Sequence, residues 1–366
     1  MLLLETKNPL LLAIKTSIED ILHADTQAMS TFSLSDDLRH KILSCLVSYS
    51  AKIPHPASYN ANADNALSNT LIRWQILAYV AGLDLTIAKW FESHLDALSI
   101  LHELGYEQAA KGLWAVWAAE GHPDPIRYSQ GKARGTKAWC SGANSVDNGL
   151  LTYRDEQARS CLLIINMHQQ GIAIDNSAWQ AVGMQATDTA TIQFNEVAAR
   201  PVGAASAYLD RAGFWHGAAG VAACWYGASA KLASYLISAY QQKPHAYKAM
   251  YLGQISTALA VNQQYFYYVA KLIDTQPKVS HELVIRQLRA NTEQLARKVI
   301  EVMGQALGAA PFCSNAHFAR LAADLPVFIR QSHGAFDLQK IGELASESIG
   351  PLSKNPLIRQ EDLWQL

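Results

Sequence analysis

Apolar residues recur at helical spacing over the first third of the chain. In "TLIRWQILAYVAGLDLTIAKWFESHLDALSILHEL" they follow one another every three or four residues, through Leu71 and Trp74 and again from Trp90 onward. The segment before it, "HPASYNANADNALSN", is rich in Asn and Pro and is typical of a loop. These patterns predict a helical domain over residues 1–115.

The periodicity changes in the middle of the chain. The stretch "GLLTYRDEQARSCLLIINMHQQG" has two apolar runs around a charged segment, which predicts a hairpin. In "TATIQFNEV", Ile192 and Phe194 alternate with polar residues, as in a half-buried strand. The run "GLWAVWAAEGHPDP" is short, apolar and ended by Gly and Pro. We therefore predict a β domain over residues 116–204.

The pattern is helical again over residues 205–366. The segment "LVIRQLRANTEQLARKVIEVMGQALG" places Val284 and Leu288 on one face and its arginines elsewhere, and Gly308 and Pro311 end it. The uncharged run "FWHGAAGVAACWYGASA" is shorter than the approximately 20 residues of a bilayer span, so it predicts a closely packed bundle helix and no membrane span. The chain as a whole is predicted to be α+β and mostly helical.

Composition narrows the classes of function. Charged residues make up 17% of the 366 residues, against the roughly 25% usual in soluble domains, so we expect part of the surface to be buried in a homodimer or homotetramer. The net charge is −1 without a basic block, so nucleic-acid binding is not expected. Five scattered cysteines and the absence of a signal-peptide pattern predict a cytoplasmic protein.

The sequence lacks the motifs of several common enzyme classes. It has no GxGxxG after a strand, no GxxxxGK[ST] and no GxSxG elbow. It also has no HExxH and no cysteine–histidine cluster at zinc spacing. We therefore expect neither a Rossmann or P-loop nucleotide site nor a metal site.

Three blocks of sequence resemble the acyl-CoA dehydrogenase family of flavoproteins. "GTKAWCS" at residues 135–141 is similar to the family's G-x-K-x-W-I-T/S, and "GMQATDT" followed by "FNEV" is similar to G-M-r-x-S-x-T and F-x-D/E-V. "GQALGAAPFCSNAHFARLAADL" is similar to Q-x-x-G-G-x-G-[YF] with a later R-D. The resemblance implies a barrel-like middle domain, a C-terminal four-helix bundle, an FAD cofactor and α,β-dehydrogenation of a small acyl substrate such as a CoA thioester.

The resemblance also implies residues that contact the flavin. Trp139 would pack beside the ring, Ser141 would hydrogen-bond near its N5 atom, and the backbone at Ala119 would line it. Such a ring needs a flat apolar wall and a few hydrogen-bonding groups. From the residues alone, the alternative is that Trp139 is a core residue of the β domain and Ser141 a turn former.

Other matched positions imply a cofactor shared between subunits. Gln305 and Gly308 match positions that approach the FAD of a neighbouring subunit. Lys243 stands where the family has an arginine at the pyrophosphate, and would act there as a point charge rather than a bidentate fork. Pro311 replaces a family glycine and cannot take a positive φ, so the turn after Gly308 must be reshaped.

The catalytic base is the clearest departure from the family. Its reaction needs a carboxylate to remove a proton, but "IRQSHGAFDLQKIG" has Ser332 and His333 where most members have glutamate. Asp210, directly before Arg211, matches the base of another branch, the alternative being an aspartate that caps a helix. Arg211, with the nearby Phe214 and Trp215, would line the substrate site.

Two other functions stay open. Monooxygenases on this fold lack the glutamate, and in such an enzyme His333 or His216 would move a proton near neutral pH. The missing base and the altered pyrophosphate motif also fit a non-catalytic scaffold. Nothing in the sequence indicates the electron acceptor or whether the substrate contains CoA.

Overall fold

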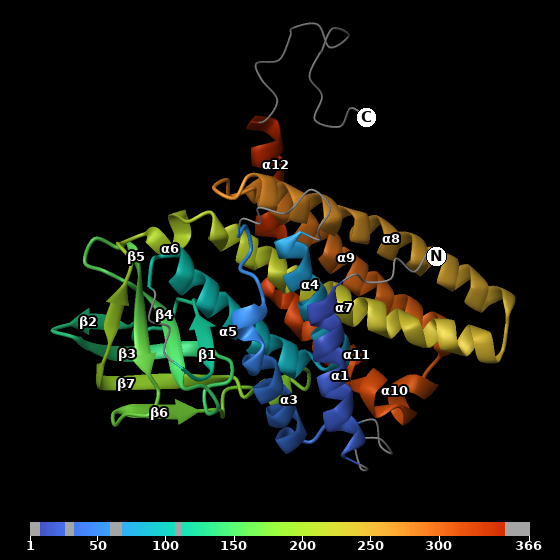
Figure 1. Ribbon diagram of the computed structural model, residues 1–366, viewed down its shortest axis with the longest axis horizontal. Helices are drawn as coiled ribbons and strands as arrows, with labels where there is room; N and C mark the ends of the chain where they lie inside the picture. Colours follow the sequence, from blue (N-terminus) through green and yellow to red (C-terminus); the bar gives the residue numbers. More distant parts are fainter. Residues whose placement is uncertain (1–7, 26–32, 59–67, 107–110, 348–366) are drawn as a thin grey trace, which may run out of the picture.

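The computed structural model describes residues 8–25, 33–58, 68–106 and 111–347, in three successive parts (Figure 1). The N-terminal part consists of α1 (Pro9–His23), α3 (Asp36–Ser48), the 3-10 turn η1 (Ser50–Lys52), α4 (Asn69–Leu83) and α5 (Leu85–Glu103). The middle part consists of β1 (Trp114–Trp117), β2 (Arg127–Ser129), β3 (Lys132–Cys140), β4 (Asn148–Arg154), β5 (Ser160–Asn166), β6 (Ile172–Asp175), the turn η2 (Gln185–Thr187), β7 (Ala190–Ala198) and β8 (Arg200–Val202). The C-terminal part consists of α6 (Ala207–Asp210), α7 (Gly213–Gln242), α8 (Ala246–Thr275), α9 (Glu282–Leu307), α10 (Ala310–Ser314), α11 (Ala316–Phe328), the turn η3 (Ile329–Gln331) and α12 (Ala335–Glu347). The predicted order of helices, strands and helices is confirmed.

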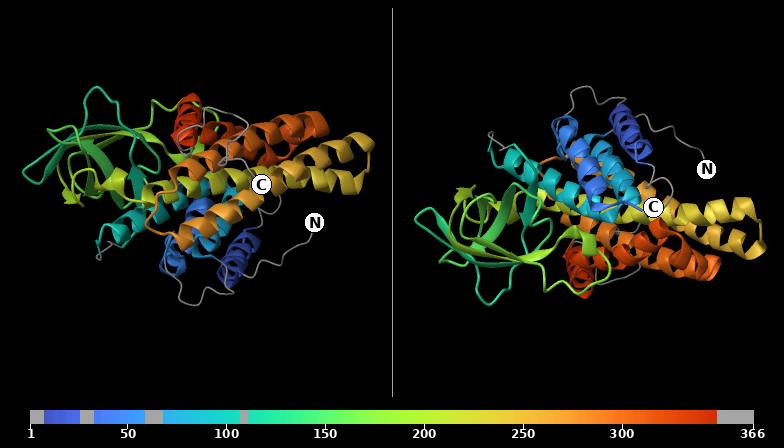
Figure 2. Two further views of the ribbon diagram at one scale, coloured as in Figure 1. Left: turned by 90° about the horizontal axis from the view of Figure 1, so that it is seen from above. Right: turned by 90° about the horizontal axis from the view of Figure 1, so that it is seen from below.

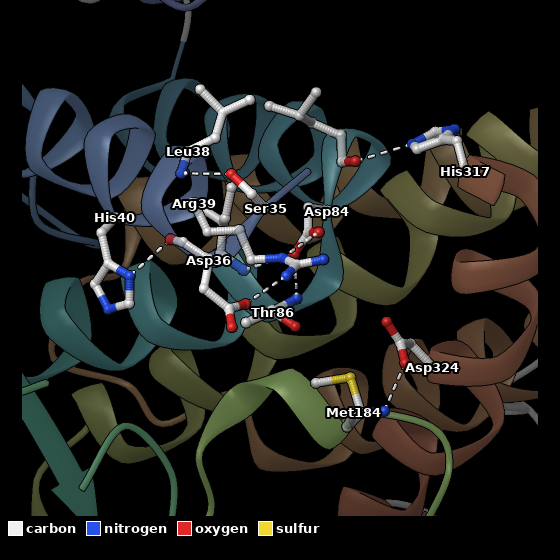
Figure 3. Close-up of polar contacts among 12 residues, drawn as sticks. Ser35, Asp36, Leu38, Arg39, His40, Asp84, Thr86, Met184, His317 and Asp324 are labelled. Atoms are coloured by element: carbon white, nitrogen blue, oxygen red, sulfur yellow. Dashed lines mark hydrogen bonds and ion pairs between the residues drawn. The ribbon is translucent and has the colours of Figure 1, made fainter. Parts of the chain in front are cut away.

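The long helical stretch before the β domain is divided at Asp84. This residue has an extended backbone, and its Oδ1 accepts hydrogen bonds from Thr86 N at 2.8 Å and Ile87 N at 3.0 Å (Figure 3). It is therefore the N-cap of α5. Its Oδ2 accepts from Arg39 Nε of α3 at 2.9 Å, so the same carboxylate joins α3 to the α4–α5 corner. Apolar spacing continues across this corner, and for that reason periodicity alone does not reveal it.

The middle part is built from two four-stranded sheets. One has the strand order β1-β4-β5-β8 and the other β2-β3-β7-β6. The predicted hairpin is the antiparallel pair β4–β5, whose register runs from Asn148 opposite Asn166 to Arg154 opposite Ser160. The predicted strand around Phe194 is β7, which lies between β3 and β6. Apolar side chains of both sheets form one buried cluster between them.

Long helices form the C-terminal bundle, which extends away from the β domain (Figures 1 and 2). On the apolar face predicted for α9, Leu288 is buried and Val284 is half-buried. The arginines Arg286 and Arg289, which the spacing places elsewhere, are buried as well. Helix α9 ends at Leu307 as expected, with Gly308 at a φ of +66°. The Gly- and Ala-rich face of α7 lets α4 approach closely, since a Cβ at Gly227 would lie 2.0 Å from Ala78 O. Within the described ranges, no helix has the combination of length and apolarity that a membrane span requires.

Candidate functional site

A bulge at the end of β3 turns Trp139 outward. The register between β3 and β7 shifts between Lys137 and Cys140, and Trp139 has a φ of +62°, which bulky residues rarely adopt. Its side chain is 65% exposed, and its ring meets that of Trp179 edge-on, with centroids 6.1 Å apart. Trp139 is therefore not a core residue of the β domain; it presents a flat apolar ring at the surface.

The lysine of the same segment points the other way. Lys137 is buried, and its Nζ donates to Thr152 O at 2.7 Å and to Thr152 Oγ1 at 2.9 Å, which ties β3 to β4. Burial lowers the pKa of Lys137 to about 8. Lys137, Thr152 and the exposed Ala119 line a cavity of about 220 Å³.

A chain of hydroxyl groups starts at Ser141. Its Oγ lies 3.0 Å from Thr189 Oγ1, which lies 2.9 Å from Thr187 Oγ1. Thr187 Oγ1 in turn donates to Met184 O at 2.6 Å. The threonines belong to the "GMQATDT" block, but the sequence assigns them no role, since only the docking of this loop against β3 brings them to Ser141.

Helix α11 fixes the start of that loop. Met184, whose φ is +57°, donates its backbone N–H to Asp324 Oδ1 at 2.5 Å (Figure 3). Directly before it, a Cβ at Gly183 would lie 2.0 Å from Ala323 O, so the two backbones are in close contact. Among the residues that the structure describes, none pairs with the buried Asp324 Oδ2, and burial raises the pKa of this carboxyl to about 6.

A second group of predicted residues meets around Arg286 of α9. The guanidinium carbon lies 4.2 Å from the ring centroid of Trp215, and Nη1 is paired with Asp337 Oδ1 of α12. Asp337 Oδ2 accepts from His333 N at 3.0 Å. Trp215 and the exposed His333 are thus parts of one network that joins α7, α9 and α12. Both oxygens of Asp337, the acid of the "SHGAFD" stretch, are engaged there.

The other three candidates around the start of α7 differ in their burial. Asp210 is exposed at the end of α6, and it does not cap α7, whose N-cap is Ala212. The side chain of Arg211 is 5% exposed, and its Nη1 lies 2.8 Å from Glu103 Oε2 of α5. Phe214 is half-buried and packs edge-on against Tyr208, with ring centroids 5.5 Å apart.

A polar cavity of about 400 Å³ lies beside Arg211, between α5 and α7. Asp96, which the sequence does not single out within its helical stretch, lines it opposite Gly217, where a Cβ would lie 2.5 Å from Asp96 Oδ1. Burial raises the pKa of the Asp96 carboxyl. His216 also lines the cavity, but its Nε2 lies 2.9 Å from Val279 O, and burial lowers its pKa. Across the described residues, no three His, Cys, Asp or Glu side chains are grouped to hold a metal ion.

The residues predicted for the remote part of FAD lie far from Trp139. Lys243 is exposed at the C-cap of α7, and the exposed Gln305 is in the last turn of α9. The α7–α8 connection and the end of α9 both lie at the end of the bundle away from the β domain (Figures 1 and 2). The reshaped turn after Gly308 is the short helix α10, with Pro311 in its first turn. One chain therefore does not bring these residues to Trp139.

Comparison with known proteins identifies the fold. No protein-family model matches the chain, and no curated protein matches its sequence. Butyryl-CoA dehydrogenase from Megasphaera elsdenii is similar in structure, with a TM-score of 0.76 and 13% identity over 94% of this chain and 99% of that one. The dibenzothiophene monooxygenase TdsC from Paenibacillus sp. A11-2, in complex with FMN and indole, has a TM-score of 0.69 and 15% identity over 94% of this chain and 97% of that one. Methanesulfinate monooxygenase MsuC from Pseudomonas fluorescens has a TM-score of 0.65 and 16% identity over 87% of this chain and 99% of that one. The chain has the acyl-CoA dehydrogenase fold.

Proposed function

We propose that this chain, which has the acyl-CoA dehydrogenase fold, is a flavin-dependent oxidoreductase. The observation on which this rests is the β3 bulge, which presents an exposed indole and, two residues later, a hydroxyl group. A Trp at a φ of +62° costs on the order of 1–3 kcal/mol, and such strain is concentrated at functional sites. A flat apolar wall beside a few hydrogen-bonding groups fits a flavin ring.

The residues of the bulge would hold and orient the cofactor. Trp139 would cover one face of the ring, Ser141 would hydrogen-bond at its N5 edge, and the backbone at Ala119 would line it. A bound flavin supplies the two-electron redox chemistry, and the protein supplies orientation and exclusion of water. Trp179, edge-on to Trp139, keeps the indole in place.

We infer that the cofactor is FAD and that a second copy of the chain completes its site. Lys243, Gln305 and Gly308 lie at the far end of the bundle, so they would reach the cofactor of a partner in a homodimer or homotetramer. TdsC is described with FMN, which lacks the adenylate that these residues would contact. Mass spectrometry of the released cofactor distinguishes FAD from FMN.

The first candidate reaction is dehydrogenation of a small acyl substrate such as a CoA thioester, with Asp210 as the base. Its carboxylate is exposed, while Arg211, Phe214 and Trp215 follow it directly at the start of α7. The polar cavity beside Arg211 would take a polar end of the substrate. Butyryl-CoA dehydrogenase shares the fold.

A monooxygenase is the second candidate, and the Arg286 network favours it. Asp337 is engaged by Arg286 and His333, so it is not a free base. The exposed His333 would then exchange a proton with the substrate or with solvent. TdsC and MsuC, which share the fold, are described as monooxygenases.

An absorption spectrum of the purified protein tests the flavin assignment. We expect flavin bands in the protein as isolated or after addition of FAD, and a protein that stays colourless after reconstitution contradicts the proposal and favours a scaffold. Anaerobic bleaching by butyryl-CoA that is lost in Asp210→Asn supports dehydrogenation. A hydroxylated product formed when oxygen is added to the chemically reduced protein with indole supports the monooxygenase.

A further inference from the structure

We propose that Thr187 and Thr189 act as positioning residues that fix the Ser141 hydroxyl as a hydrogen-bond acceptor toward the bound cofactor. This inference rests on the proposed flavin site. It follows from the order in which three hydroxyl groups use their single protons, and each step is set by a contact in the structure.

The order begins at a group that can only accept. Met184 O has no proton, so the 2.6 Å contact with Thr187 Oγ1 uses the proton of Thr187. Thr187 Oγ1 can then only accept in its 2.9 Å contact with Thr189 Oγ1, so the proton there comes from Thr189. The proton of the 3.0 Å contact between Thr189 and Ser141 must therefore come from Ser141. Ser141 Oγ keeps only lone pairs for a further partner.

The surroundings prevent the chain from reversing. Thr187 is 1% exposed and Thr189 is 6% exposed, so water does not offer an alternative partner. Thr187 O accepts from Trp90 Nε1 at 2.9 Å and from Gly142 N at 2.8 Å, which fixes the backbone that bears the hydroxyl. Asp324 holds Met184 at the start of the chain. A fixed, buried network of this kind has one favoured arrangement of its protons.

The direction of these hydrogen bonds favours one redox state of a bound flavin over the other. The N5 atom of the ring accepts a hydrogen bond when the ring is oxidised and bears a proton, and so donates, when it is reduced. A Ser141 that can only accept stabilises the reduced state and has no proton to offer the oxidised one. The hydroxyl chain therefore raises the midpoint potential of the bound flavin above that of a site in which the serine is free to donate.

The experiment measures the dissociation constant of oxidised FAD and the midpoint potential of bound FAD in matched variants. In Thr189→Val the Ser141 hydroxyl loses its acceptor, so its proton is free to be donated to the flavin. In Thr187→Val the Thr189 hydroxyl loses its acceptor and can donate to Ser141 instead, which also frees the Ser141 proton. In both we expect oxidised FAD to gain about tenfold in affinity relative to reduced FAD, which is a fall of about 30 mV for a two-electron couple. Thr187→Ser and Thr189→Ser keep the hydroxyl groups and should retain the wild-type potential.

Ser141→Ala distinguishes a change in the direction of the hydrogen bond from the loss of the hydrogen bond itself. It removes the acceptor, so the potential falls, but oxidised FAD gains no affinity. An unchanged potential in both valine variants that still bind FAD overturns the hydroxyl-chain proposal alone, and so does an equal fall in the serine variants. Failure of the wild-type protein to bind any flavin overturns the proposed function as well.

Discussion

Trp139 holds an unfavourable backbone conformation and gains little from burial. At 65% exposure, its indole is shielded mainly by the edge-on contact with Trp179. Trp139→Ala should therefore change the free energy of unfolding by no more than about 0.5 kcal/mol, as is usual for surface sites. The same change should weaken FAD binding at least about tenfold, because the apolar wall of the ring is lost. Urea unfolding and fluorescence titration with FAD measure the two effects.

A matched control removes an exposed apolar side chain away from α8. Leu12 of α1 is 65% exposed, as Trp139 is, and Leu12→Ala should leave both the free energy of unfolding and the affinity for FAD nearly unchanged. If Trp139→Ala destabilises the protein by several kcal/mol and leaves FAD affinity unchanged, the indole is a structural residue and not a binding surface.

Asp324 predicts a specific pH dependence of stability. Its pKa is raised by burial from 3.8 to about 6 in the folded protein, so between these values the folded state binds more protons than the unfolded state. Its contribution to stability is then present below about pH 4 and is lost as the pH rises toward 6 and above. The amide in Asp324→Asn does not titrate. Between pH 4 and 7 the free energy of unfolding of the wild type should therefore fall by up to about 3 kcal/mol relative to that of this variant.

Urea unfolding of both proteins at several pH values measures this difference, because all other titrating groups are shared. Asp175→Asn is the control of opposite sign, since hydrogen bonds from Ser177 lower the pKa of the exposed Asp175. There the free energy of unfolding of the wild type should rise, not fall, relative to its variant as the pH increases toward about 4, because the pKa of Asp175 lies below 3.8 in the folded protein. A constant difference between wild type and Asp324→Asn contradicts the assigned environment of Asp324.

At the scale of elements, the contact of α4 with α7 depends on a missing side chain. A Cβ at Gly227 would lie 2.0 Å from the backbone oxygen of Ala78, so Gly227→Ala forces the helices apart and should cost at least about 2 kcal/mol. Gly253 of α8 has open space at the same position, and Gly253→Ala should stabilise by about 0.5–1 kcal/mol through helix propensity. Denaturant unfolding of both variants measures this contrast, and equal effects would contradict the packing.

The elements could be predicted from the sequence where one pattern is uninterrupted, as in α9 and β7. The α4–α5 corner could not, because Asp84 acts through a cap and through Arg39, 45 residues away, while apolar spacing continues. Trp139 and Ser141 are close in sequence, so one motif suggests both. The contact of Met184 with Asp324 spans 140 residues and depends on the docking of α11, which no local pattern encodes.

At the scale of the whole molecule, the proposed cofactor site needs two copies of the chain. Strand β3, which contains Trp139, and the α7–α8 connection, which contains Lys243, lie at opposite ends of one subunit (Figure 1). Large apolar side chains also remain exposed along α8, at Tyr247, Met250 and Val261, and uncovered apolar surface of this kind is typical of a subunit contact. The sequence predicts the oligomer from its low charge and from the family resemblance at Gln305 and Gly308, since spacing along one chain contains no information about a partner's residues.

Mixing variants tests this division of the site. We expect Trp139→Ala and Lys243→Ala homodimers each to bind FAD weakly, because every site in them lacks one contact. A heterodimer of the two has one site with both defects and one site with none. Because random mixing makes about half of the dimers heterodimers, co-refolded variants should regain tight binding at about a quarter of all sites. If the mixture binds no more FAD than the average of the two homodimers, the proposed division of the site between subunits is wrong. Trp139 and Lys243 then either contact FAD within one chain or do not both contact it.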